Sequence, residues 1–172
     1  MSTSILYHGW GLKGYHYVRT DYPQGQILFT VKPAPGTMAC PACGGRQLIH
    51  HGGTERIWRQ VPIGSKPVFI RMSIPRVECR ECETIRQVEV GFAAARHTYT
   101  RQFERYALEL SRHMTILDVA RHLNMGWDLI KDIQKRFLKR RFARPKLGKL
   151  RQIAIDEISI GKGKKYLTEG LD

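Results

Sequence analysis

The sequence predicts an α+β protein in which a small β domain precedes a helical domain. Short segments that alternate apolar and polar residues, broken by Gly and Pro, run from Tyr15 to about residue 90. From about Tyr99 the apolar residues instead recur with the period of an α-helix. Four cysteines in two pairs of equal spacing fall inside the alternating region, where they can join its strands.

Size and charge limit the kind of protein and its partners. The chain has 172 residues, which suffice for one or two small domains. Its formal charge is +14, whereas its hydrophobic content of 42% is ordinary for a folded protein, so a polyanionic partner is expected. No apolar run approaches the roughly 18 residues of a membrane span. The N-terminus also lacks the features of a signal peptide, so the sequence predicts a cytoplasmic protein without a membrane partner.

The β domain is expected to contain five strands. They are predicted at Tyr15–Thr20, Gln26–Lys32, Glu55–Val61, Val68–Val77 and Ile85–Val90. The first two flank the turn-forming cluster 21–25 and should pair as a hairpin. Trp10, Trp58 and Phe69 have the rings needed for stacking on bases. In a domain with so few apolar residues, a role in the core is the favoured interpretation.

The cysteines are the clearest chemical signal in the β domain. They are Cys40, Cys43, Cys79 and Cys82, and they form two C-x-x-C pairs. In an intracellular chain such pairs are the usual ligands of a structural zinc ion, because the two-residue spacer lets both thiolates reach one metal. Two disulfides or a redox dithiol remain as alternatives. His50 and His51 are chemically able to bind metal but are interpreted as ordinary strand or turn residues.

Three helices are predicted after the β domain. Their inward residues are expected to be Phe103, Tyr106, Ala107, Leu110 and Met114 in the first, Ile116, Val119, Ala120 and Leu123 in the second, and Ile130, Ile133, Phe137 and Leu138 in the third. The second helix should begin at Thr115, an N-cap residue with Asp118 at the third helical position. In the turn 124–126, Asn and Gly tolerate positive φ. A third helix over about 127–142 completes the sequence form of a helix-turn-helix.

A plain three-helix bundle has the same apolar stripes, so the charges decide between it and a DNA-binding motif. Between Lys131 and Arg151 there is one acid, Asp132, against ten basic residues: Lys131, Lys135, Arg136, Lys139, Arg140, Arg141, Arg144, Lys146, Lys149 and Arg151. In a helix-turn-helix the start of the second helix reads bases while flanking basic residues hold phosphates. The base-facing candidates are Trp127, Asp128, Lys131 and Lys135, and the phosphate candidates are Lys139, Arg140, Arg141 and Arg144. Double-stranded DNA is therefore the predicted partner. Asp128 fits this role if it caps the helix or accepts from a cytosine amine.

Several stretches together resemble one known family over nearly the whole chain. They are Cys40–Cys43, Arg76–Cys82, Tyr99–Ser111, Met114–Asn124, Ile155–Glu157 and Lys162–Thr168. With ribbon, helix-turn-helix, basic linker and acidic strand in this order, the chain resembles the N-terminal part of the ISL3 family of insertion-sequence transposases. The turn departs from the family, which more often has Gly and a Ser cap where this chain has Asn124 and Gly126. The third helix is therefore expected to start less firmly.

The resemblance also implies a third, catalytic part. The family continues into a ribonuclease-H-like domain whose two aspartates and one glutamate bind divalent metal, and Asp156, on a predicted strand 153–160, matches the first aspartate. After it the sequence has only Glu157, Glu169 and Asp172 as carboxylates, whereas two-metal phosphoryl transfer needs several. The run 169–172 is also expected to break the apolar strand pattern after Thr168. Asp156 is accordingly interpreted as a relic of an incomplete site, with magnesium required only if a complete catalytic domain is supplied.

Three domains follow from these observations: a zinc ribbon over 1–92, a helix-turn-helix domain over 93–144, and a basic linker with the first strand of a truncated ribonuclease-H-like domain over 145–172. The predicted function is sequence-specific DNA binding at transposable-element ends by a truncated transposase with structural zinc. The N-terminal part of an active transposase and a transcriptional repressor remain as alternatives. Whether the chain is an enzyme stays open, and a homodimer is one assembly compatible with the sequence.

Overall fold

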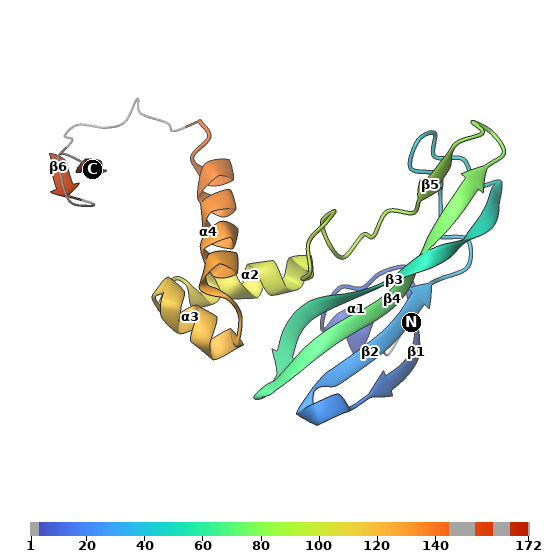
Figure 1. Cartoon of the computed structure of the whole chain (residues 1–172), viewed down its shortest axis with the longest axis horizontal. Coiled ribbons are helices and arrows are strands. Elements are labelled where there is room, and N and C mark those ends of the chain that lie inside the picture. Colours follow the sequence, from blue (N-terminus) through green and yellow to red (C-terminus); the bar gives the residue numbers. More distant parts are fainter. Residues whose placement is uncertain (1–3, 145–153, 160–165, 172) are drawn as a thin grey trace. The chain divides into compact units, whose positions relative to one another are not determined.

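The computed structural model describes residues 4–144, 154–159 and 166–171 (Figure 1). These residues form two compact units, Met1–Gln134 and Lys135–Asp172. Three of the basic residues counted above, Lys146, Lys149 and Arg151, lie outside the described residues. The three-domain division given above follows function rather than compactness, and it stays a prediction.

The first unit opens with a short helix and a five-stranded sheet. Its elements are α1 (Ile5–His8), β1 (Tyr15–Asp21), a 3₁₀ turn (Pro23–Gly25), β2 (Ile27–Pro33), β3 (Leu48–Ile63), β4 (Lys66–Cys79) and β5 (Ile85–Gln87). The sheet order is β1-β2-β4-β3, and β5 pairs with β4 beyond this path. The predicted hairpin of β1 and β2 is confirmed as an antiparallel pair. The β2–β4 pair is parallel, whereas β3 and β5 each run antiparallel to β4.

Two strand boundaries differ from the sequence prediction by more than two residues. β3 begins at Leu48 rather than Glu55, because a register shift between His50 and Gly53 absorbs the glycines that looked like a break. Gly52 lies there at φ 73°, the left-handed region that a bulge with glycine uses. β5 ends at Gln87 instead of Val90.

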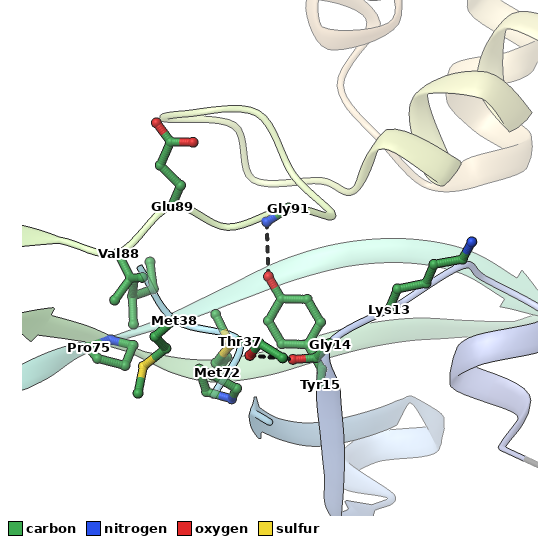
Figure 2. Close-up of a pocket in the computed structure, with 12 residues that line it drawn as sticks. Lys13, Gly14, Tyr15, Thr37, Met38, Met72, Pro75, Val88, Glu89 and Gly91 are labelled. Atoms are coloured by element: carbon green, nitrogen blue, oxygen red, sulfur yellow. Dashed lines mark hydrogen bonds between the residues drawn. The ribbon is translucent and has the colours of Figure 1, made fainter. Parts of the chain in front are cut away.

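The sheet domain has its own apolar core. It consists of Leu6, Trp10, Leu12, Ile27, Val31, Trp58, Val68, Ile70, Met72, Ile74, Phe92 and Ala93. Trp58 is 1% exposed and meets the Phe92 ring edge-on, with centroids 5.1 Å apart. The core role predicted for Trp10 and Trp58 is thus confirmed. Near the edge of this core the Tyr15 hydroxyl accepts a hydrogen bond from the Gly91 N–H (2.9 Å), as Figure 2 shows. Burial raises the pKa of Tyr15.

Three helices follow the sheet, α2 (Arg101–Leu110), α3 (Ile116–Leu123) and α4 (Trp127–Arg141). Thr115 caps α3 as predicted, because its side chain accepts the Asp118 N–H (3.2 Å). Asn124 takes the left-handed conformation that ends α3 (φ 50°), but Gly126 does not use a positive φ. Eight buried residues form the helical core: Tyr99, Phe103, Ala107, Val119, Ala120, Leu123, Ile130 and Ile133.

The expectation that Phe137 and Leu138 face inward is wrong. Their exposed fractions are 39% and 49%, whereas Ile130 and Ile133 are fully buried. The helix α4 has 15 residues against 10 in α2 and 8 in α3, so the shorter helices cover only its first turns. An apolar stripe in the sequence cannot show where that cover ends.

The second unit contains the strands β6 (Ala154–Ser159) and β7 (Tyr166–Leu171), which pair antiparallel with Asp156 opposite Glu169. The run after Thr168 interrupts the apolar pattern, as expected, but β7 continues through Glu169 and Gly170. Backbone pairing with β6 outweighs the low strand preference of these two residues. A two-stranded hairpin occurs in many folds, so the ribonuclease-H-like assignment of this unit stays a prediction. Among the described helices, none is both long and apolar enough to cross a membrane.

Candidate metal centre and nucleic-acid interface

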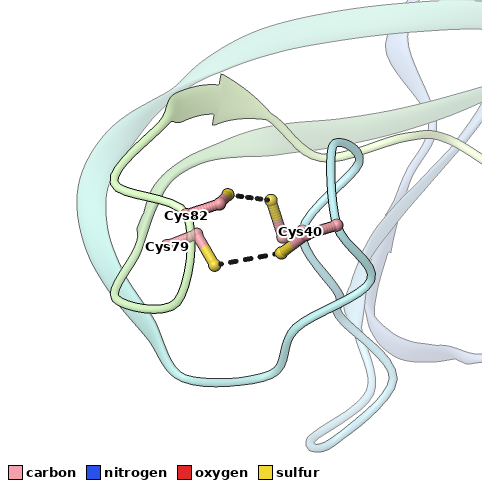
Figure 3. A group of neighbouring side chains, drawn as sticks. Cys40, Cys79 and Cys82 are labelled. Carbon is pink, nitrogen blue, oxygen red and sulfur yellow. Dashed lines mark hydrogen bonds between the residues drawn. The ribbon is translucent and has the colours of Figure 1, made fainter.

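The four cysteine sulfurs converge at one end of the sheet domain, where the loop before β3 meets the turn after β4 (Figure 3). All four lie within 4.8 Å of one another. The Cys40 and Cys82 sulfurs are 3.6 Å apart, and those of Cys43 and Cys79 are 3.5 Å apart. A tetrahedral zinc site with bonds of about 2.3 Å separates its sulfurs by roughly 3.8 Å, so this set fits zinc. The same distances exceed the roughly 2.05 Å of a disulfide bond, so the four cysteines are unbonded in this structure.

The two C-x-x-C turns, called knuckles below, have the same backbone hydrogen bonds. In the first, the Cys40 N–H donates to the Gly45 carbonyl and the Gly44 N–H donates to the Cys40 carbonyl, both at 2.8 Å. The equivalent bonds of the second knuckle are Cys79 N–H to the Thr84 carbonyl (3.0 Å) and Glu83 N–H to the Cys79 carbonyl (2.8 Å). Each knuckle thus orients its two thiols through the same backbone hydrogen bonds, and Cys79 also belongs to β4, where it pairs with Leu48.

Glu81 joins the knuckles to each other. Its Oε1 accepts the Arg46 N–H (3.0 Å), while the Arg80 N–H donates to the Gln47 carbonyl (2.9 Å). A Cβ at position 45 would lie 2.7 Å from the Glu81 Oε2, closer than carbon and oxygen can approach, so a larger residue at 45 would displace the Glu81 carboxylate. The spacing of the cysteines predicted the ligands, but no sequence pattern pointed to Glu81.

The thiols have opposed proton affinities. The Cys43 and Ala42 N–H groups lower the pKa of Cys40 to about 6. At Cys43 the Gly45 N–H lowers the pKa, but the neighbouring Cys82 and Cys79 sulfurs together outweigh it and raise the pKa to about 12. Four thiols this close cannot all ionise without a compensating charge, which a divalent cation supplies.

The two histidines weighed as ligands lie outside this cluster. The His51 Nε2 pairs with the Glu78 carboxylate at 2.7 Å, and the His50 Nδ1 accepts the Gly52 N–H at 3.2 Å. Their interpretation as ordinary strand residues agrees with these contacts.

All eight DNA-contact candidates, Trp127, Asp128, Lys131, Lys135, Lys139, Arg140, Arg141 and Arg144, are exposed. The Lys131 Nζ lies 4.6 Å from the centroid of the Trp127 ring, so the two side chains form a cation–π contact on the first turns of α4. Asp128 lies in the first turn, where the helix dipole favours a negative charge. Gly126 precedes α4 and offers only its carbonyl, which accepts the Leu129 N–H (3.1 Å).

A buried polar link between the sheet and the helices was not predicted from the sequence. Arg59 on β3 is 6% exposed, and its Nη2 donates to the Leu123 carbonyl at the end of α3 (3.0 Å). Its guanidinium lies 5.0 Å from the Phe69 ring and 5.9 Å from the Phe103 ring. Burial lowers the pKa of Arg59. No sequence signal singled out Arg59, because β3 also contains Glu55, Arg56 and Gln60.

The next residue of β3 extends this link to α2. The Gln60 side chain is fully buried, and its Oε1 accepts the Thr100 hydroxyl (2.9 Å). Thr100 in turn caps α2 by accepting the Phe103 N–H (3.1 Å). One strand therefore supports both the start of α2 and the end of α3.

Four converging cysteines on a sheet domain, followed by a helix-turn-helix, are the features of the class of zinc-ribbon proteins with a DNA-binding domain. Residues 36–82 match the model of the zinc-finger of transposase IS204/IS1001/IS1096/IS1165. Residues 78–138 match the model of the helix-turn-helix domain of transposase family ISL3. The chain thus carries the zinc ribbon and the helix-turn-helix domain of the ISL3 transposase family, as its motifs predicted.

A curated relative agrees with the family models. The chain is 28% identical over 165 residues to the transposase for insertion sequence element IS1001 of Bordetella parapertussis. The alignment covers 94% of this chain and 41% of that protein, so the chain spans about two fifths of the relative's length. No solved structure matches the chain.

Proposed function

We propose that this chain binds double-stranded DNA at the ends of a transposable element and recognises their sequence through α4. The observation that carries the proposal is the exposed face at the start of this helix, where the Lys131 Nζ lies 4.6 Å from the centroid of the Trp127 ring. In a helix-turn-helix this part of the second helix lies in the major groove. The transposase name of the relative supports element ends as the target.

The residues of α4 divide into two roles in this proposal. Lys131 and its neighbours Trp127, Asp128 and Lys135 face the base edges, where Lys bonds guanine acceptors and the indole contacts thymine methyl groups. The later residues Lys139, Arg140, Arg141 and Arg144 neutralise phosphates and contribute affinity without sequence information. Zinc, held by the four cysteines, has a structural role. Of Asp156, the candidate catalytic residue, only the backbone is described, so no chemical step is assigned to it.

Two lysines on the same helix test this division, and they are matched in charge. Lys131→Ala should weaken binding to the terminal repeat by on the order of 1–3 kcal/mol and leave scrambled DNA nearly unaffected, because a base contact is lost. Lys139→Ala should weaken both DNAs alike and reduce the salt slope by roughly 0.9, because one counterion is no longer released. Fluorescence anisotropy across a salt series measures both quantities.

Equal ratios of the two affinities in both variants would refute the assignment of α4 as the recognition helix. Selection of bound fragments from genomic DNA is a second experiment, which identifies the sites that the protein binds tightly. Tight sites at promoters instead of inverted repeats would contradict the element-end proposal and favour a transcriptional repressor.

A further inference from the structure

A second basic site includes no residue of α4: it is a pocket of about 460 Å³ between β3, the segment after β5 and the start of α2. Three arginines line it, Arg56, Arg96 and Arg101, and we call it the arginine pocket. Glu89 is the one carboxylate among its lining residues. The pocket walls therefore carry a net positive charge.

The arginine charges are available to a ligand. Arg56 is held in place, because its Nη2 donates to the His97 carbonyl (2.9 Å) and its guanidinium lies 5.3 Å from the Trp58 ring. Arg96 and Arg101 are exposed, and within the described part of the chain neither forms an ion pair. A fixed guanidinium beside two unpaired ones is a suitable receptor for a phosphate group, which Arg binds through two parallel hydrogen bonds.

The backbone at the start of α2 does not provide this receptor. The Arg101 N–H already donates to the Phe92 carbonyl (2.8 Å), and the Phe103 N–H donates to the Thr100 hydroxyl (3.1 Å). The arginine side chains must therefore supply the attraction. A further donor belongs to the same wall: Trp58 is 1% exposed, and its Nε1 has no hydrogen-bond partner among the described residues.

We propose that the arginine pocket binds a phosphodiester of the duplex that α4 reads. This inference rests on the proposed function and adds a contact made by the sheet domain and α2. A phosphate held here fixes the register of the module on DNA without reading sequence. The link from β3 to α2 and α3 through Gln60 and Arg59 keeps this contact in the same unit as α2, α3 and the first turns of α4.

A double variant tests the pocket in the zinc-loaded protein. Arg96→Asn with Arg101→Gln removes two charges, and asparagine suits position 96, whose φ is 64°. We expect the salt slope of binding to fall by roughly 1.8, equally for the terminal repeat and for scrambled duplex. The matched control is Arg76→Gln with Arg86→Gln, two exposed arginines outside the pocket that also form no ion pair among the described residues, and its slope should stay near that of the unchanged protein. Circular dichroism and zinc content verify that each variant is folded.

The results separate this inference from the proposed function. In one outcome, the unchanged protein prefers the repeat while the salt slope of the pocket variant does not fall, or falls no more than that of the control. This result would refute the phosphodiester contact in the arginine pocket and leave the proposed function intact. No sequence preference in the unchanged protein overturns the proposed function itself. Ethylation interference gives an independent readout: a phosphate whose ethylation impairs the unchanged protein should cease to matter in the pocket variant. The last experiment is a titration with inorganic phosphate alone. If phosphate saturates the pocket without any change in duplex binding, the pocket binds a free anion and the proposal is refuted.

Discussion

At the scale of single residues, Glu83 holds a backbone conformation that its side chain disfavours. Its φ is 55°, and it donates to the carbonyl of the first cysteine of its knuckle. Gly44 occupies the equivalent position of the first knuckle at φ 79°. A residue with a Cβ loses roughly 1–2 kcal/mol in this region, whereas glycine does not. The two knuckles are therefore alike in hydrogen bonding and unequal in strain.

Glu83→Gly should stabilise the zinc-loaded protein by about 0.5–1 kcal/mol. The relieved strain exceeds the additional chain entropy that glycine gives the unfolded state. Gly44→Ala is the mirror control and should destabilise by about 1 kcal/mol, because space is open there and only the φ is unfavourable. Urea unfolding measures both, and a stabilising Gly44→Ala would contradict the comparison of the knuckles.

Some residue roles could be predicted from the sequence and others could not. The metal ligands and the Thr115 cap were predictable, because each depends on spacing within a few residues. Glu81 was not, because its role arises only when two knuckles separated along the chain meet. The same limit explains Phe137: its stripe continues that of Ile133, but burial depends on the lengths of the partner helices.

At the scale of elements, β3 is more than a strand of the sheet, because Arg59 projects from it to the end of α3. The contact joins residues 64 positions apart. Arg59→Met keeps most packing on Phe69 and Phe103 but removes the bond to the Leu123 carbonyl, so a loss of about 1 kcal/mol is expected. Arg59→Ala also leaves a cavity and should cost roughly 2–4 kcal/mol. Urea unfolding should rank the two variants in this order, and an alanine variant as stable as the unchanged protein would exclude Arg59 as the link.

Helices and strands could be predicted from the sequence where residues close together in the chain determine them. The hairpin of β1 and β2 and the three helices follow from turn residues, caps and period. The start of β3 was missed because Gly52 was interpreted as a break, whereas a bulge accommodates it. The strand β7 was not predicted, because Glu169 and Gly170 have low strand preferences that backbone pairing with β6 outweighs.

At the scale of the whole molecule, the ribbon and the helix-turn-helix each have a core, and polar contacts from β3 join them. The two cores could be predicted from the sequence, because the spacing of the apolar residues changes from strand-like alternation to the helical period. The contacts that join them were not, since neither Arg59 nor Gln60 belongs to a recognisable motif. Removal of the zinc ion tests whether the helices stay folded when the ribbon unfolds.

We expect one zinc ion per chain, and removing it should unfold the ribbon while sparing the helices. Structural zinc contributes an apparent 10–16 kcal/mol, roughly as much as the whole stability of an ordinary domain. The strands before about residue 92 should therefore unfold with a chelator under reducing conditions. The helical core contains no residue of the ribbon, so α2, α3 and the first turns of α4 should persist. Elemental analysis gives the zinc content, and far-ultraviolet circular dichroism with limited proteolysis locates the unfolded part.

The persisting helices should nevertheless be weaker than in the loaded protein. Without β3, the Thr100 cap loses Gln60 and the end of α3 loses Arg59, at about 1 kcal/mol for each bond. The helical signal should thus melt at a lower temperature after zinc removal, and Arg59→Met should lower it in the loaded protein but not in the stripped one. A folded, reduced ribbon without zinc would contradict the metal assignment. Helices that unfold together with the ribbon would show instead that the contacts from β3 make both cores one cooperative unit.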